Sequence, residues 1–294
     1  MTYSTIAVIY NPNSTGSSKD LAEDFVSQLS EKLPDQKVEL IATERAAHAE
    51  ELAYDLAVNN ENPLIISSSG DGGYNEVVNG ALKAQSEGRT VTTGLLPAGN
   101  ANDHYHNLHD RSFIDSVVAG ETRRIDVLKI TSQVNGEALQ RYAHSYIGIG
   151  LTPEVGHELN KTKLNFFKEV ALVGRVLFKT SPVKLKINDR VRRYDSVIFS
   201  NIEKMSKYLT VSQESSVSDG KFELTIFRFR QKFKLIGVLL KASLVGLKED
   251  QQVSEFGFET VNQTLVQADG EIITLDANAP VSIKIEQKLL SCIV

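Results

Sequence analysis

The chain has 294 residues, of which 41% are hydrophobic and 23% are charged, as in a globular protein long enough for two domains. Its formal net charge of −5 argues against a general nucleic-acid partner. The single cysteine, Cys292, excludes an intrachain disulfide. No uninterrupted apolar run reaches the roughly 20 residues of a membrane helix, and the first residues lack the features of a secretory signal. We therefore expect a cytoplasmic protein whose contact with a membrane, if any, is peripheral on the inner face.

The first part of the chain alternates between strand and helix patterns. Short apolar runs predict strands, and apolar residues at helical spacing predict helices between them. This βαβαβ order predicts a parallel sheet with right-handed crossovers in a domain of residues 1–124. The strands are expected at residues 6–10, 38–41, 63–66 and 91–96, and the helices around residues 21–29 and 48–58.

The pattern changes at residue 125, where short strand-like runs follow one another closely. Such runs, separated by turn residues, predict an antiparallel β-rich domain over residues 125–294. Two helical segments interrupt them, at 165–180 and 231–247. The strands are expected at 126–131, 141–151, 183–187, 196–201, 208–211, 222–229, 253–258, 264–268, 272–275, 281–285 and 289–294.

The stretch from Ser67 to Gly80, SSSGDGGYNEVVNG, combines the end of a strand, a glycine-rich turn and the start of a helix. Free backbone N–H groups and the positive end of the helix dipole converge there, so the stretch predicts a phosphate site. The glycines are expected to allow left-handed angles and close approach of a ligand. Asp71 beside phosphates indicates Mg²⁺. A plain strand–turn–helix connection is the alternative.

A second loop, Gly94 to Asp103, again follows an apolar strand and ends in small and amide residues with a carboxylate. Loops at the carboxyl ends of parallel strands gather on one edge of the sheet, where ligands bind. We therefore expect the two loops to face each other at one site.

Together with three further segments, these loops resemble the catalytic family of diacylglycerol kinases, which includes sphingosine and ceramide kinases. The further segments are Asn11-Pro12-Asn13-Ser14, Ser218-Asp219-Gly220 and Asp269-Gly270-Glu271, and all five occur in the family's order. The resemblance implies a Rossmann-like parallel α/β domain that binds nucleotide, followed by an antiparallel β-sandwich domain, with the active site in the cleft between them. It also implies transfer of the γ-phosphoryl group of ATP to a lipid alcohol, with Mg²⁺.

The resemblance assigns roles to individual residues. Glu271 is expected to be the general base with help from Asp269, and Asp103 to lie near the acceptor and the metal. Mg²⁺ is expected at Asp71, with a structural ion at Asp219. The nucleotide site is expected to comprise Asn11, Ser14, Thr43, Gly70, Asp71, Gly72, Gly73, Asn75, Glu76, Gly99, Asn100 and Asn102.

Each assignment has a simpler alternative. Asp269-Gly270 also suits an ordinary two-residue hairpin, Asp103 a helix N-cap, and Glu76 a favourable charge at a helix start. Asp219, Asn11 and Ser14 also suit plain turns.

The chain departs from the family's pattern at several positions. The common GGDGT has become Ser69-Gly70-Asp71-Gly72-Gly73, which lacks the final hydroxyl. In the common GTxNDF, Asn100 replaces threonine and His104 replaces phenylalanine. Ser218 stands in place of an aspartate, which puts the structural metal in doubt. These changes leave the expected base in place.

The acceptor is open to two further interpretations. A kinase of a soluble acceptor, as in the NAD kinases, shares a GDG-type loop with a following NE pair. A catalytically weak relative would bind nucleotide or lipid without turnover. The β-rich second half and the DGE segment favour the lipid kinase. The cluster of His104, His106 and His109 is expected to be solvated or near the acceptor and to bind no metal.

Residues 161–193 contain ten lysines or arginines and two acidic residues, a local charge of +8. The helix expected at 165–180 combines apolar residues with Lys168, Arg175 and Lys179, and is expected either to lie on an anionic membrane surface or to pack on the β-rich domain. The oligomeric state is left open, with a homodimer as one option.

Overall fold

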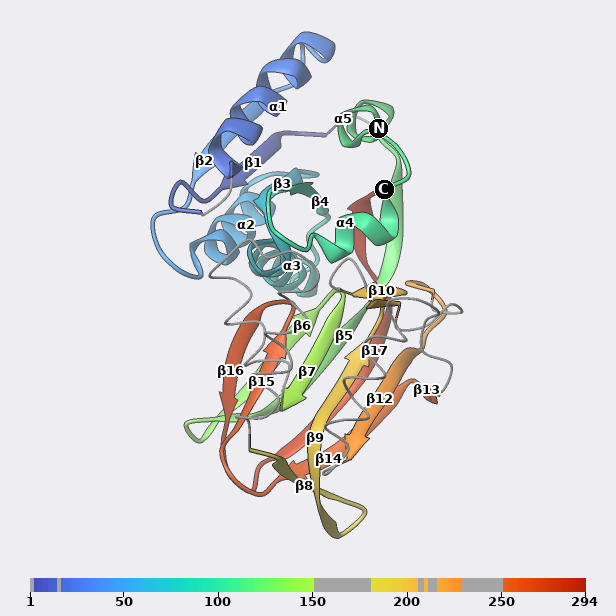
Figure 1. Ribbon diagram of the computed structural model, residues 1–294. Helices are drawn as coiled ribbons and strands as arrows, with labels where there is room; N and C mark the ends of the chain where they lie inside the picture. The colour runs from blue at the N-terminus through green and yellow to red at the C-terminus, as the bar shows by residue number, and fades with distance from the viewer. Residues whose placement is uncertain (1–2, 15–16, 151–180, 206–208, 211–215, 229–250) are drawn as a thin grey trace. The chain divides into compact units, whose positions relative to one another are not determined.

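The computed structural model describes residues 3–14, 17–150, 181–205, 209–210, 216–228 and 251–294 (Figure 1). It divides into two compact units, unit 1 with Met1–Ile125 and Lys288–Val294, and unit 2 with Asp126–Gln287. The chain passes between the units within strands β5 (Thr122–Val134) and β17 (Pro280–Ile293). The last residues therefore belong to unit 1, not to the β-rich part in which the sequence pattern places them.

Unit 1 is built on parallel strands in the order β4-β3-β1-β2, and all three pairings between them are parallel. The end of β17 lies parallel to β4, with Cys292 opposite Thr93. The predicted parallel α/β fold is thus confirmed. Its elements are β1 (Ile6–Tyr10), α1 (Ser18–Lys32), β2 (Val38–Ala42), α2 (His48–Asn59), β3 (Leu64–Ser69), α3 (Asp71–Ser86), β4 (Thr92–Pro97), α4 (Asp103–Leu108) and α5 (Phe113–Ala119).

Helices pack on both faces of this sheet because successive strand side chains point to opposite sides. Ile6 and Val8 pack in one core with residues of α1 and α5, while Ile9 packs in another with residues of α2 and α3. Helices α2 and α3 lie side by side (Figure 1) and approach closely, since a Cβ on Gly80 would lie 2.1 Å from the carbonyl oxygen of Glu50.

Unit 2 is antiparallel and consists of strands only among the residues that the structure describes. Its sheet runs β16-β15-β7-β9-β8-β14-β17, with β12 beside β9 and β13, and β6 beside β5. The predicted β-rich second half is confirmed. Its further strands are β6 (Glu137–Ala143), β7 (Tyr146–Gly150), β8 (Val183–Ile187), β9 (Arg190–Ser200), β10 (Lys204–Met205), β11 (Leu209–Thr210), β12 (Phe222–Arg228), β13 (Gln251–Val253), β14 (Glu255–Thr260), β15 (Thr264–Ala268) and β16 (Glu271–Leu275).

Four strand predictions are wrong in how the runs are divided, since two runs are broken and two others are joined. The run 141–151 is broken between β6 and β7, because the backbone N–H groups of His144 and Ser145 bind the Asp269 carboxylate. The run 253–258 falls in two strands, β13 and β14. The runs 281–285 and 289–294 belong to one strand, β17, in which Lys288 has a positive φ of 49°.

The helices predicted at 165–180 and 231–247 lie outside the described residues, as do positions 208 and 211 of the strand predicted at 208–211, whose described residues form β11. Among the described helices, none combines the length and the apolar character that crossing a bilayer requires.

Candidate functional site

A cavity of about 380 Å³ lies in unit 1 where the parallel strands end. Tyr10 ends β1, Ser69 ends β3, and Thr43 follows β2 directly. This is the edge of the sheet where the sequence predicts ligand binding. The lining residues are Ile9, Tyr10, Asn11, Asn13, Thr43, Glu44, Arg45, Ala46, Ala49, Ser67, Ser69, Gly73 and Glu76.

Two serine hydroxyls form part of the cavity wall. Ser67 and Ser69 lie on the same side of β3 because they are two residues apart, and their Oγ atoms are 2.7 Å from each other. Ser68 points to the opposite side, where its hydroxyl donates to the carbonyl of Ser18 at 2.8 Å. The period of the strand thus divides three consecutive serines between the cavity and the core.

The start of α2 closes another part of the wall. The carboxylate of Glu76, on α3, accepts hydrogen bonds from the backbone N–H groups of Ala47 and Ala49, both at 3.3 Å. Glu76 therefore caps the neighbouring helix, α2. Its charge alone would suggest a role at the start of its own helix, α3. Arg45 donates from Nη1 to Glu51 at 2.8 Å, and this hydrogen bond lowers the pKa of the Glu51 carboxyl. Among the described residues that line the cavity, Arg45 alone carries a positive charge.

The glycine-rich segment is already helical where the sequence predicts a turn. Helix α3 begins at Asp71, so Gly72 and Gly73 lie in its first turn. Neither they nor Gly70 has a positive φ, and the predicted left-handed conformations are absent there. The other predicted property, close approach, is present in a different form. A Cβ on Gly99 would lie 2.3 Å from Cα of Gly70, so the glycines allow the two loops to contact each other.

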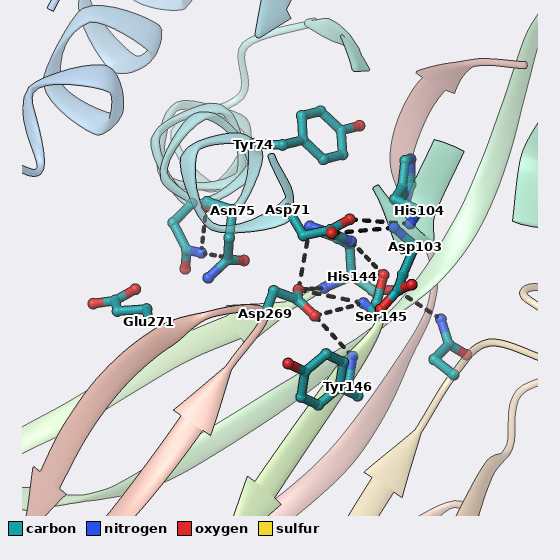
Figure 2. A network of polar contacts seen from close by, with 12 residues as sticks. Asp71, Tyr74, Asn75, Asp103, His104, His144, Ser145, Tyr146, Asp269 and Glu271 are labelled. Carbon is teal, nitrogen blue, oxygen red and sulfur yellow. Dashed lines mark hydrogen bonds and ion pairs between the residues drawn. The ribbon is translucent and has the colours of Figure 1, made fainter. Parts of the chain in front are cut away.

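Asp71 joins the same two loops through its carboxylate (Figure 2). Its Oδ2 accepts a hydrogen bond from the backbone N–H of Asp103, and its Oδ1 accepts one from that of His104, both at 3.1 Å. These donors open α4, whose N-cap is Asn102. Asp103 is thus the first residue of the helix and not its cap, because Asp71 supplies the capping carboxylate from outside.

Asn102 holds the second loop in shape. It has a positive φ of 52°. Its Oδ1 accepts from the N–H of Gly99 at 2.9 Å, and its Nδ2 donates to the carbonyl of Gly99 at 3.0 Å. This amide is therefore engaged within the loop.

In unit 2, Asp269 and Gly270 form the two-residue connection between β15 and β16, where Ala268 is paired with Glu271. Their positive φ values of 45° and 96° are those of a type I′ hairpin, for which Asp-Gly is a preferred sequence. The simpler interpretation of this segment as a hairpin is correct as a description of its backbone.

The carboxylate of Asp269 is fully buried and accepts hydrogen bonds from three consecutive backbone N–H groups, those of His144, Ser145 and Tyr146 (Figure 2). His144 adds a side-chain contact, with Nε2 at 3.3 Å from Oδ2. Asp269 points into unit 2, where it fixes the break between β6 and β7 and so anchors the hairpin that carries Glu271.

Glu271 starts β16 and remains partly exposed. Its Oε2 accepts a hydrogen bond from Nε of Arg141 at 2.7 Å, and Nη2 of the same guanidinium lies at 2.7 Å. Because the pair is charge-assisted and uses two nitrogen atoms of one rigid group, it holds the carboxylate in a defined direction. Arg141 is thus the residue that orients Glu271.

Some of the expected nucleotide residues line the cavity and others do not. Asn11, Thr43, Gly73 and Glu76 line the cavity. Asn75 is fully buried beside Asn79, whose Nδ2 donates to it at 3.2 Å. The residues that do not line the cavity are Ser14, Gly70, Asp71, Gly72, Asn75, Gly99, Asn100 and Asn102.

The two expected metal ligands belong to different units. Asp71 belongs to unit 1 and Asp219 to unit 2. Asp219 is exposed, and its Oδ1 accepts from the N–H of Lys221 at 3.0 Å in an Asx turn, as the simpler interpretation predicts. Within the described ranges, no group of three or more His, Cys, Asp and Glu side chains is arranged to hold a metal ion.

The three histidines near α4 have different surroundings. His104 is buried against Tyr74, with ring centroids 4.7 Å apart, and His106 is exposed. His109 stacks on Tyr105 at 4.4 Å, and burial lowers the pKa of its imidazole.

Sequence reasoning missed Ser67, Ser69, Arg45 and Arg141. The alternation within a strand that ends in three serines was an available signal for the first two. Arg141 carries no local signal, because it is 130 residues from its partner Glu271.

Known proteins resemble this chain both in sequence and in fold. Residues 5–130 match the family model of the diacylglycerol kinase catalytic domain. A diacylglycerol kinase of Bacillus subtilis is 30% identical over 241 residues, which cover 75% of this chain and 73% of that protein. A solved structure of a diacylglycerol kinase from Bacillus anthracis superposes with a TM-score of 0.72 at 18% identity, over 100% of this chain and 97% of the other.

A yeast NADH kinase structure has the same general fold, with a TM-score of 0.50 at 12% identity, over 100% of this chain and 84% of the other. The B. subtilis relative is similar enough, over enough of both chains, to show common family membership. The chain therefore belongs to the diacylglycerol kinase family and is a lipid-kinase-type phosphotransferase with an alcohol group as acceptor.

Proposed function

We propose that this protein transfers the γ-phosphoryl group of ATP, with Mg²⁺, to the hydroxyl of a diacylglycerol-like or other long-chain lipid alcohol. The observation that carries the proposal is the cavity at the carboxyl ends of β1 and β3, next to the first turn of α3, with serine, threonine and asparagine residues in its lining. The name of the B. subtilis relative supports diacylglycerol as the first acceptor to test.

The cavity residues suit a nucleotide phosphate. The hydroxyls of Ser67, Ser69 and Thr43 and the amides of Asn11 and Asn13 are hydrogen-bond donors. Helix α3 starts at Asp71, so the N–H groups of its first turn have no acceptor within the helix and face a negative charge favourably.

Asp71 also suits Mg²⁺. Protein sites for this ion often use one or two carboxylates together with the phosphates of the substrate, so a full ligand cluster is not required. Each oxygen of Asp71 accepts one backbone N–H, so the orientation of the carboxylate is fixed. When bound there, the ion would neutralise charge that develops on the phosphates. The exposed Asp219 in its Asx turn is not included in this proposal.

Glu271 is proposed to take the proton of the acceptor hydroxyl. General-base assistance by a positioned carboxylate contributes typically about 10²–10⁴-fold to a rate. Arg141 fixes the direction of the Glu271 carboxylate, and Asp269 anchors its hairpin through the 144–146 backbone. In this proposal Asp269 positions Glu271 and does not itself handle the proton, while Asp103 is a proposed neighbour of the acceptor.

The experiment is a transfer assay with γ-labelled ATP and Mg²⁺. Four acceptors are offered separately: dioleoylglycerol in mixed micelles, a sphingoid base, NAD and glycerol. Label in phosphatidic acid supports the proposal. Label in NADP alone would replace it by the soluble-acceptor kinase, a possibility kept open by the fold shared with the yeast NADH kinase. Nucleotide binding without any labelled product would identify a catalytically weak relative.

Peripheral contact with an anionic membrane is part of the proposal, because the acceptor lies in a bilayer. The segment 161–193 has a local charge of +8, and its described portion includes the exposed Lys184, Arg190, Arg192 and Arg193 of β8 and β9. Each basic residue near such a surface contributes about 1 kcal/mol. Co-sedimentation with phosphatidylglycerol vesicles, compared with phosphatidylcholine vesicles, tests this contact.

Sedimentation velocity tests the oligomeric state, for which a homodimer is one option.

A further inference from the structure

We infer that the Ser69 hydroxyl contacts a phosphate of the bound nucleotide in this chain. It would do so in place of the hydroxyl that the common GGDGT pattern carries at the position of Gly73. The inference rests on the proposed nucleotide site and adds to it a residue at which this chain departs from the family's common pattern. It assigns Ser69 and Gly73 as a compensating pair.

The geometry shows why the two positions depend on each other. A Cβ on Gly73 would lie 2.7 Å from Oγ and 2.8 Å from Cβ of Ser69. Real Cβ atoms do not approach other atoms so closely, so a side chain at 73 and the present Ser69 side chain exclude each other. Ser69 thus occupies the space from which a residue-73 side chain would project. The common pattern has glycine at the first of these positions and threonine at the second, and this chain has the reverse, serine and glycine.

The hydroxyl is also placed to reach a ligand. Ser69 and Gly73 both line the cavity, and Ser69 is only partly buried. Gly73 lies in the first turn of α3, where helix N–H groups favour a phosphate. The carboxylate of Glu76, which caps the start of α2, already accepts from two N–H groups. Its negative charge would repel a phosphate. The wall formed by Ser67, Ser69 and Gly73 is therefore where the phosphate is expected.

The proton of Ser69 is available for such a bond. Its hydroxyl donates to the carbonyl of Gly70 at 2.9 Å, so in the pair at 2.7 Å Ser67 is the donor and Ser69 the acceptor. A phosphate oxygen is a stronger acceptor than a carbonyl because it is charged. Binding of the nucleotide would redirect the Ser69 proton from Gly70 to the phosphate, while the bond from Ser67 keeps the Ser69 hydroxyl in place.

The test is a double-mutant cycle with S69G, G73T and S69G/G73T, with S69A as a separate probe of the hydroxyl. Binding of Mg²⁺ and the non-hydrolysable analogue AMP-PNP is measured by calorimetry on the full chain, and melting temperature is measured in parallel. S86A is the control, because Ser86 is an exposed serine near the other end of α3.

We expect S69A to weaken AMP-PNP binding by roughly tenfold or more, the usual effect of losing a hydrogen bond to a charged group, with little change in melting temperature. G73T alone should lower both affinity and melting temperature because of the clash. S69G/G73T should recover both, to within a few-fold of the original affinity, since the hydroxyl returns to position 73 and the clash is removed. S86A should bind like the unmodified chain.

Two results would overturn the inference. One is unchanged AMP-PNP affinity in S69A, and the other is a double variant that binds no better than the weaker single variant. Failure of the proposed function is distinguishable from either. In that case the unmodified chain itself would show no binding of Mg²⁺ and AMP-PNP, whatever residue stands at position 69.

Discussion

Asp71 and Asp103 belong to different loops, and a hydrogen bond of 3.1 Å from the backbone N–H of Asp103 to Oδ2 of Asp71 joins them. A second bond of the same length runs from His104 to Oδ1. The carboxylate thus caps α4 while standing at the first position of α3. One residue couples the shapes of both loops, so changes in either loop should affect the other.

Asp71→Asn should reduce stability and kinase activity together. An amide has one oxygen to accept from the two N–H groups, and its NH₂ group would face the second donor. Leaving a buried donor unsatisfied costs about 1–3 kcal/mol. Denaturant unfolding measures the loss, and Asp55→Asn is the control because Asp55 is exposed on α2. Equal stabilities of the two variants would contradict the capping role of Asp71.

Gly99→Ala should destabilise unit 1. The new Cβ would lie 2.3 Å from Cα of Gly70 and 2.8 Å from Oδ1 of Asn102, and such overpacking costs typically about 1–3 kcal/mol. Gly257→Ala is the matched control, since its Cβ would meet nothing closer than 3.9 Å. Thermal unfolding should separate the two variants, and a Gly99→Ala protein as stable as Gly257→Ala would disprove the close contact of the loops.

Glu271→Gln should leave the fold intact and reduce phosphoryl transfer by about 10²–10⁴-fold, the range for a lost general base. The variant keeps the size of the side chain and an acceptor for Arg141. Glu255→Gln removes a carboxylate from an exposed ion pair with Lys284 in the same unit and should retain activity. Near-normal turnover in Glu271→Gln would remove Glu271 from the mechanism.

Arg141→Met should lower kcat more than it raises the KM for ATP, because Arg141 acts by orienting Glu271 and does not line the cavity proposed to bind the nucleotide. Partial recovery is expected in Arg141→Lys, which restores the charge without the two-nitrogen contact. Steady-state kinetics at saturating acceptor measures both constants. A change confined to the KM for ATP would argue against the positioning role.

Stability should fall in mild acid through His109. Burial lowers the pKa of its imidazole from the ordinary 6.5, so below that value the unfolded chain binds the proton more readily than the folded one. The contribution to stability is therefore complete above about pH 6.5 and is lost as the pH falls through the folded-state pKa. His109→Phe should flatten the dependence of the urea midpoint between pH 7.5 and 5, whereas the exposed His106→Asn should not. Identical slopes would exclude His109 as the source.

The order of strands and helices could be predicted from the sequence because it depends on local periodicity. The alternation at 6–97 and the short strands beyond 125 determined an α/β unit followed by a β-rich one. The motif residues also indicated the family, since glycine loops and the DGE segment keep their spacing within the chain. Such signals concern residues close in sequence, where backbone geometry alone restricts what can form.

The functions of individual side chains depended on partners distant in the chain. Asp269 is anchored by residues 144–146, Glu76 caps a helix 27 residues before it, and residues 288–294 return to the parallel sheet of unit 1. Hydrogen bonds and packing form wherever the folded chain brings donors, acceptors and surfaces together, irrespective of sequence separation. Sequence by itself therefore determined the elements and the family, while only the tertiary structure decided which carboxylates hold the backbone and which one faces outward with an arginine beside it.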